Sequence, residues 1–158
     1  KEYHSIGGLD EFFFAHMEEI DLCWRLKNQD HKIMVCPTST VYHVGGGTLN
    51  KVKPQKTFLN FRNSLLTLHK NLKKKDRFRI IFIRLLLDGL AGIKFITSGK
   101  PDHTWAIVRA HFSFYGAISQ NKNKRKVFNA SNLTGQINKS IVKGYYLKNC
   151  KTFNDFIK

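Results

Sequence analysis

The sequence predicts a mixed α/β fold that is followed by a mainly α-helical, basic segment. Residues 32–36 and 40–43 are short and partly β-branched, and Pro37 separates them, which is typical of two strands. Apolar residues recur at steps of three and four in 16–28 and 58–72, which is typical of helices. The chain has 158 residues, of which 42% are hydrophobic, and this is enough for one folded domain with a core.

Charge divides the chain after Asn50. Residues 1–50 hold 4 Lys and Arg against 7 Asp and Glu, a balance of −3, whereas residues 51–158 hold 23 against 4, a balance of +19. Such an excess of positive charge must be accommodated by solvent or by an anionic partner. We therefore expect a site in the acidic part and an anchor over residues 51–116, with a polar tail rich in Lys and Asn over 117–158.

The cysteines indicate the redox compartment that we expect for the protein, and the first residue indicates whether we expect a fragment. Cys23, Cys36 and Cys150 form no CxxC pair, which argues against a disulfide framework and against a cysteine-based zinc site. A reducing, cytoplasmic compartment is the simpler expectation. The chain begins at Lys1 and no signal-peptide pattern follows, so we expect a fragment whose N-terminal portion is missing.

The acidic part begins with a loop that enters a helix. Residues 7–14 start with two glycines suited to a close turn and then carry three consecutive phenylalanines. The helix predicted from His16 to Asn28 places Glu18, Asp21 and Arg25 on neighbouring turns. This spacing concentrates the acidic residues on one part of the helix.

The basic part contains a long apolar run. Residues 77–96 are almost wholly apolar, but Arg79, Arg84, Asp88 and Lys94 interrupt them. A membrane-spanning helix needs about 20 apolar residues, and each central charge costs about 2.5–3.5 kcal/mol, so spanning is disfavoured.

A peripheral position at an anionic membrane surface suits residues 77–115 better. Three lysines at 73–75 precede the run, and each basic residue near such a surface contributes about 1 kcal/mol. Aromatic residues would extend the same surface, namely Trp105, Phe112, Phe114 and Tyr115. The alternative is an ordinary core hairpin of two helices.

Three motifs lie close together in the acidic part. They are Gly-Gly-Leu-Asp-Glu at 7–11, Glu-Glu-Ile-Asp-Leu-Cys-Trp-Arg-Leu at 18–26 and Tyr-His-Val-Gly-Gly-Gly-Thr at 42–48. Together they resemble the C-terminal half of the catalytic domain of family 2 glycosyltransferases, which have the Rossmann-like GT-A fold, and most of all the bacterial rhamnosyltransferase-like members. The resemblance covers residues 5–70 closely, and the basic segment that follows resembles the membrane-proximal tail of such enzymes more loosely.

The resemblance implies a metal-dependent, inverting transferase. It would move a sugar from a nucleotide-sugar donor to a lipid-linked or saccharide acceptor in cell-surface polysaccharide synthesis, at the inner face of the cell membrane. Glu19 stands where the family has the carboxylate that deprotonates the acceptor hydroxyl, although Asp is more usual there. Because a general base must lie within about 2.6–3.2 Å of its proton and Glu is one methylene longer, Glu18 is the alternative base.

The acidic pattern also has a plainer interpretation. Crowded carboxylates raise one another's pKa, which suits a catalytic set of Glu18, Glu19 and Asp21. The same spacing is typical of a solvated acidic helix face on which Arg25 pairs with Asp21. The flanking motifs favour the catalytic interpretation.

The expected substrate-binding residues are Gly7, Gly8, Asp10, Arg25 and Arg62. The planar guanidinium of Arg62 suits a diphosphate-linked acceptor, and the alternative is a solvent-exposed helix arginine. His43 precedes three glycines at 45–47 and matches a family histidine that helps to hold a divalent Mg or Mn ion, the alternative being a structural histidine.

The family's Asp-x-Asp metal motif is absent from this sequence. We therefore expect metal binding to need the missing N-terminal half, and the chain alone to be inactive. A second hypothesis is a non-catalytic basic module that binds an anionic membrane or nucleic acid. Nucleic acid is the less favoured partner, because no nucleic-acid-binding motif is recognisable.

Overall fold

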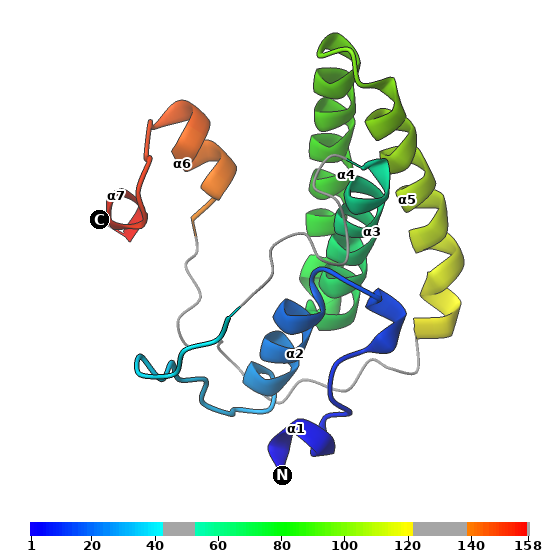
Figure 1. Ribbon diagram of the computed structural model, residues 1–158. Coiled ribbons are helices and arrows are strands. Elements are labelled where there is room, and N and C mark those ends of the chain that lie inside the picture. The colour runs from blue at the N-terminus through cyan, green and yellow to red at the C-terminus, as the bar shows by residue number, and fades with distance from the viewer. Residues whose placement is uncertain (43–52, 122–138, 158) are drawn as a thin grey trace.

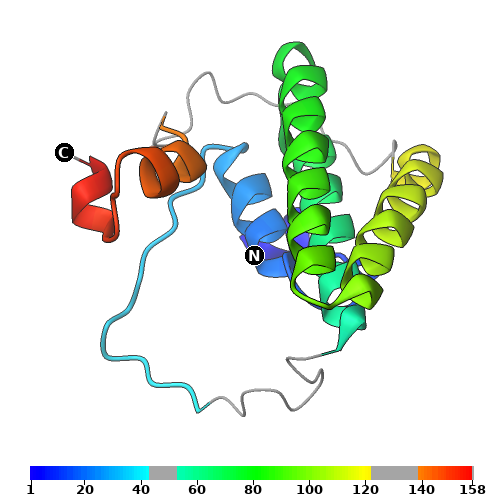
Figure 2. The ribbon, with the colours of Figure 1, turned by 90° about the horizontal axis from the view of Figure 1, so that it is seen from above.

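The computed structural model describes residues 1–42, 53–121 and 139–157, and in this part of the chain all regular structure is helical. The elements are α1 (Glu2–Ser5), the 3₁₀ helix η1 (Glu11–Phe13), α2 (Glu18–Lys27), α3 (Pro54–Asn71), α4 (Lys74–Thr97), α5 (Pro101–Asn121), α6 (Ile141–Leu147) and α7 (Phe153–Ile157). Helices α3, α4 and α5 pack against one another as a bundle, and α2 packs against α3 (Figure 1). Helices α6 and α7 lie apart from the bundle in both views (Figure 2).

The prediction of an α/β, Rossmann-like GT-A fragment is wrong for the described residues. Residues 32–36 and 40–42 form no strand, and their apolar side chains are exposed, with Val35 at 86% and Tyr42 at 96%. A β-branched run becomes a strand only when a second strand pairs with it and one face is buried. Within the described ranges no strand is present to pair with them, so these residues stay outside regular secondary structure.

The predicted helices are confirmed, with boundaries that local chemistry explains. Helix α3 begins at Pro54, whose missing N–H is not needed in the first turn, and α5 likewise begins at Pro101. Only Leu72 and Lys73 separate α3 from α4, and three residues separate α4 from α5. Such short connections place consecutive helices side by side, which makes the bundle the natural arrangement of this segment.

The core joins the N-terminal segment to the bundle. Phe13 from η1 is fully buried among Leu65 and Leu66 of α3 and Phe114 and Ala117 of α5. Partly buried side chains of α4, including Ile81 and Leu85, pack against this cluster. Among the helices of the described ranges, none is both long enough and apolar enough to cross a lipid bilayer.

Candidate functional site

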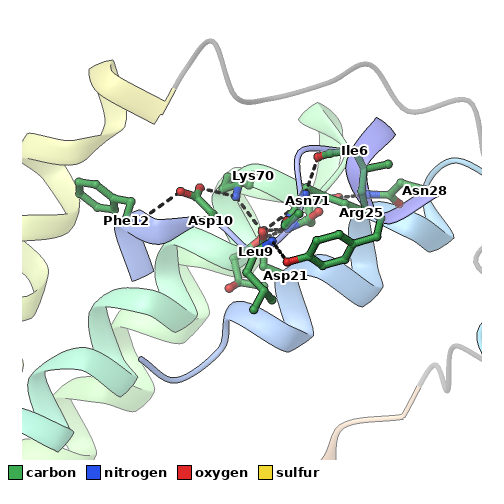
Figure 3. A network of polar contacts seen from close by, with 12 residues as sticks. Ile6, Leu9, Asp10, Phe12, Asp21, Arg25, Asn28, Lys70 and Asn71 are labelled. Atoms are coloured by element: carbon green, nitrogen blue, oxygen red, sulfur yellow. Dashed lines mark hydrogen bonds and ion pairs between the residues drawn. The ribbon is translucent and has the colours of Figure 1, made fainter. Parts of the chain in front are cut away.

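A buried carboxylate holds α2 against α3. Asp21 is 0% exposed and accepts three hydrogen bonds, from Arg25 Nε at 2.8 Å, Lys70 Nζ at 2.8 Å and Asn71 Nδ2 at 2.7 Å (Figure 3). Two of the donors are cationic, so the charge of the carboxylate is compensated where water cannot reach it. Asp21 is therefore the anchor of α2.

Lys70 links this anchor to the N-terminal loop. Its ammonium Nζ, on a residue that is 4% exposed, also forms an ion pair with Asp10 Oδ2 at 2.9 Å. The same ammonium lies 5.0 Å from the centre of the Phe13 ring. Lys70 is thus surrounded by two carboxylates and an aromatic face, all of which favour its positive charge.

Arg25 fixes the glycine turn that precedes η1. Its Nη1 donates to the carbonyl oxygen of Ile6 at 2.7 Å and its Nη2 donates to that of Gly8 at 2.6 Å. Gly7 and Gly8 have φ of +85° and +62°, in the left-handed region that only glycine adopts easily. A Cβ on Gly8 would also lie 3.1 Å from the ring of Tyr3, so this turn needs glycine for two reasons.

Asn63 of α3 holds the segment that leads into α2. Its Nδ2, on a side chain that is 0% exposed, donates to the carbonyl oxygens of Phe13, Ala15 and His16, each at 2.9 Å. Three residues here have φ in the left-handed region, namely Phe14 at 62°, His16 at 69° and Met17 at 74°. Because each costs about 1–2 kcal/mol for a residue other than glycine, the amide of Asn63 compensates local strain.

Arg62 supports the same segment from the neighbouring position on α3. Its Nη2 donates to the carbonyl oxygens of Phe12 at 3.0 Å and Phe13 at 3.3 Å, and its guanidinium lies over the rings of Phe12 and Phe58. Burial lowers the pKa of Arg62 from its usual value, although an arginine stays charged. Arg62 is therefore engaged by the protein's own backbone and rings.

The strained segment places an acidic pair in the first turn of α2. Glu19 is exposed, whereas Glu18 is half-buried and its Oε2 is buried without a hydrogen-bond partner among the described residues. Carboxylates at this end of a helix are stabilised by the helix dipole. The exposed carboxylate of Glu19 is accessible to a substrate hydroxyl. It stands on a helix that the buried Asp21 holds against α3.

The structure brings most of the predicted site residues into one region. Around Asp21 it gathers Gly7, Gly8, Asp10 and Arg25, whereas Arg62 lies two turns before Lys70 on α3 and holds the other end of the same segment. Lys70 and Asn71 are contributors that sequence reasoning missed, whereas Asn63 is the neighbour of the predicted Arg62. The sequence signal for Asn63 and Lys70 is that two polar residues stand seven positions apart on the apolar face of the predicted helix. They lie three residues before and four residues after Leu66.

The expected metal ligands are not tested by this part of the chain. His43 and the glycines at 45–47 lie outside the described residues. Elsewhere, the described ranges contain no group of three or more His, Cys, Asp or Glu side chains placed to hold a metal ion. The carboxylates of Asp10 and Asp21 are paired with cationic side chains, a donor set that does not suit a divalent ion.

Comparison with known proteins adds no relative. No family model, no curated protein and no solved structure matches the chain. The features of the chain that bear on its function are the acidic pair, its supporting contacts and the surfaces of the bundle.

Proposed function

We propose that the chain is the acceptor-activating part of an inverting glycosyltransferase of bacterial cell-surface polysaccharide synthesis. The acceptor would be a lipid-linked or free saccharide and the donor a nucleotide sugar, as in the rhamnosyltransferase-like enzymes that the motifs resemble. The observation that carries the proposal is the exposed Glu19 carboxylate on a helix locked in place by buried ion pairs. The Rossmann-like fold is not part of the proposal for these residues.

In the proposed reaction Glu19 acts as the general base. Its carboxylate takes the proton of the acceptor hydroxyl while the hydroxyl oxygen attacks the anomeric carbon of the donor sugar. The bond from that carbon to the diphosphate oxygen breaks on the opposite side, and the nucleoside diphosphate leaves with the electron pair. A single displacement of this kind inverts the configuration at the anomeric carbon.

The supporting contacts give the base its position. A general base must come within about 2.6–3.2 Å of the group that it deprotonates, and small displacements are costly. Asp21 and its donors prevent α2 from shifting along α3, and Asn63 fixes the backbone immediately before the helix. These buried contacts supply the rigidity that a catalytic carboxylate requires.

The location belongs to the same proposal: cytoplasmic and peripheral at the inner face of the cell membrane. Exposed apolar side chains on α4 and the basic residues near them favour such a surface. The same observation favours a second candidate function, a non-catalytic module that binds an anionic membrane. The two candidates differ in whether the Glu19 carboxylate has a chemical role.

Substitution of the acidic pair separates these candidates. In the longest natural form of the protein, we expect Glu19→Gln to lower kcat by about 10²–10⁴-fold, measured as release of nucleoside diphosphate in the presence of a lipid-linked saccharide. Glu2→Gln, which changes an exposed glutamate of α1 outside the three motifs, is the matched control and should leave kcat unchanged. Retention of more than half the activity by Glu19→Gln, with loss in Glu18→Gln, would move the base to Glu18. If the wild-type protein transferred sugar from no nucleotide sugar, the transferase proposal would be wrong, and the membrane-binding module would be the remaining candidate.

A further inference from the structure

Helix α4 has two apolar faces, and the bundle uses only one of them. The inner face contributes Ile81 and Leu85 to the core and buries Asp88 and Gly92. The outer face, at steps of three and four residues, consists of exposed Phe78, Phe82, Leu86, Leu90 and Ile93. A continuous row of large exposed apolar side chains is unusual on a protein surface and marks a site of interaction.

Basic residues stand at both ends of this outer face. At its N-terminal end they are the exposed Lys74, Lys75 and Arg79, and at its C-terminal end Lys94 and Lys100. Since helix turns repeat every 3.6 residues, Lys75 and Arg79 fall on the same side as Phe82 and Leu86. The outer face therefore combines an apolar centre with two positive ends.

The outer face has little negative charge. Asp88, one of two acidic residues on α4, is 2% exposed and accepts from Arg84 Nε at 2.6 Å, with His111 Nε2 3.1 Å from its other oxygen. Its charge is thus compensated inside the bundle. The other, Asp76, lies half-buried in the first turn of the helix, next to the lysines.

We propose that the outer face of α4 docks on the surface of an anionic lipid bilayer, with the helix parallel to the membrane plane. Phe78, Phe82 and Leu86 would enter the boundary between headgroups and acyl chains, while the lysines reach the lipid phosphates. This inference rests on the membrane location proposed above, but it does not depend on transferase activity. The proposed membrane-binding surface is also smaller than the one predicted from the sequence over residues 77–115, because Phe114 of the aromatic cluster is buried in the core.

A second copy of the chain is a poorer occupant of this face. Two identical outer faces would bring basic ends together in either a parallel or an antiparallel arrangement, and neither carries the acidic residues needed to compensate them. The chain as a whole has a formal charge of +16, which adds to the repulsion. An anionic bilayer is complementary to both features, the apolar centre and the positive ends.

Sedimentation of the full chain with vesicles tests the proposal. We expect binding to vesicles of phosphatidylcholine with phosphatidylglycerol, weak binding to phosphatidylcholine alone, and release at about 1 M salt, where the Debye length is about 3 Å. Lys74→Gln with Lys75→Gln should weaken binding by about 30-fold, because each lysine near the surface is worth about fivefold. Lys148→Gln, at an exposed lysine beyond α6, is the matched control.

The apolar part has its own matched pair of variants. Leu86→Gln with Leu90→Gln should weaken binding by at least about tenfold, whereas Leu147→Gln, at a leucine of α6 that is more exposed than either, should not. All of these side chains are exposed, so circular dichroism should show unchanged helix content. Equal binding by the α4 variants and the wild type would overturn the proposal. A second result would also overturn it. The wild type would fail to bind vesicles and would form a dimer in light scattering, and the double variant Leu86→Gln with Leu90→Gln would dissociate that dimer.

Discussion

Replacement of Lys70 by methionine should weaken the attachment of the N-terminal segment to α3. The ammonium forms ion pairs of 2.9 Å with Asp10 and 2.8 Å with Asp21, and Asp21 is 0% exposed. Removing one partner of a buried ion pair costs about 3–5 kcal/mol, because the other charge is left uncompensated. Asp21 keeps its bonds to Arg25 and Asn71, so we expect a loss of about 3 kcal/mol in the free energy of unfolding.

Urea unfolding followed by tryptophan fluorescence measures this loss. Trp24 lies on α2 and Trp105 on α5, so a Trp105→Phe background reports the N-terminal segment and a Trp24→Phe background reports the bundle. At about 2–4 °C for each kcal/mol, the melting temperature should fall by about 6–12 °C. Lys74→Met, at an exposed lysine, is the control and should change stability by less than about 0.5 kcal/mol. A loss below about 1 kcal/mol in Lys70→Met would refute the reasoning, since one partner of a buried ion pair cannot be removed alone at so small a cost.

The other contacts lead to three further expectations, each measured as the free energy of unfolding in urea. Asn63→Ala should cost about 3 kcal/mol, because the carbonyl oxygens of Phe13, Ala15 and His16 all lose their bond from the buried Asn63 amide, and a cost near zero would mean that water replaces the amide. Leu65→Ala should cost about 2–5 kcal/mol through the cavity left in the core, and a smaller loss would contradict the packing. Gly8→Ala should cost about 1–2 kcal/mol because of its left-handed backbone, and an unchanged stability would show that the turn does not need glycine.

The helices could be predicted from the sequence because their signal is local. The apolar patterns in 16–28 and 58–72 correspond to α2 and α3, and the proline that begins α3 marks its start. The strands could not be predicted reliably, because the β-branched run at 32–36 says nothing about whether a second strand is available to pair with it. A local pattern predicts a helix better than a strand for this reason.

The candidate site was predictable only where its contacts are short in sequence. The pair of Asp21 and Arg25 follows from a spacing of four residues and is present, although it is buried and not solvated as the plainer interpretation expected. The donors from α3 are about 50 residues away from the groups that they bind, and no spacing rule reaches that far. Lys70 stands on an apolar face where a lysine is unusual, and this was the only sequence signal of its role.

The long contacts between the N-terminal segment and α3 also set an order of folding. Lys70 and Asp10 are 60 residues apart, and Asn71 and Asp21 are 50 apart, whereas α3, α4 and α5 follow one another through connections of two and three residues. Closing a long loop costs more entropy than closing a short one, so neighbouring helices associate early and distant segments join later. We therefore expect the carboxylates of Glu18 and Glu19 to reach their final positions only after the donors of α3 are already in place.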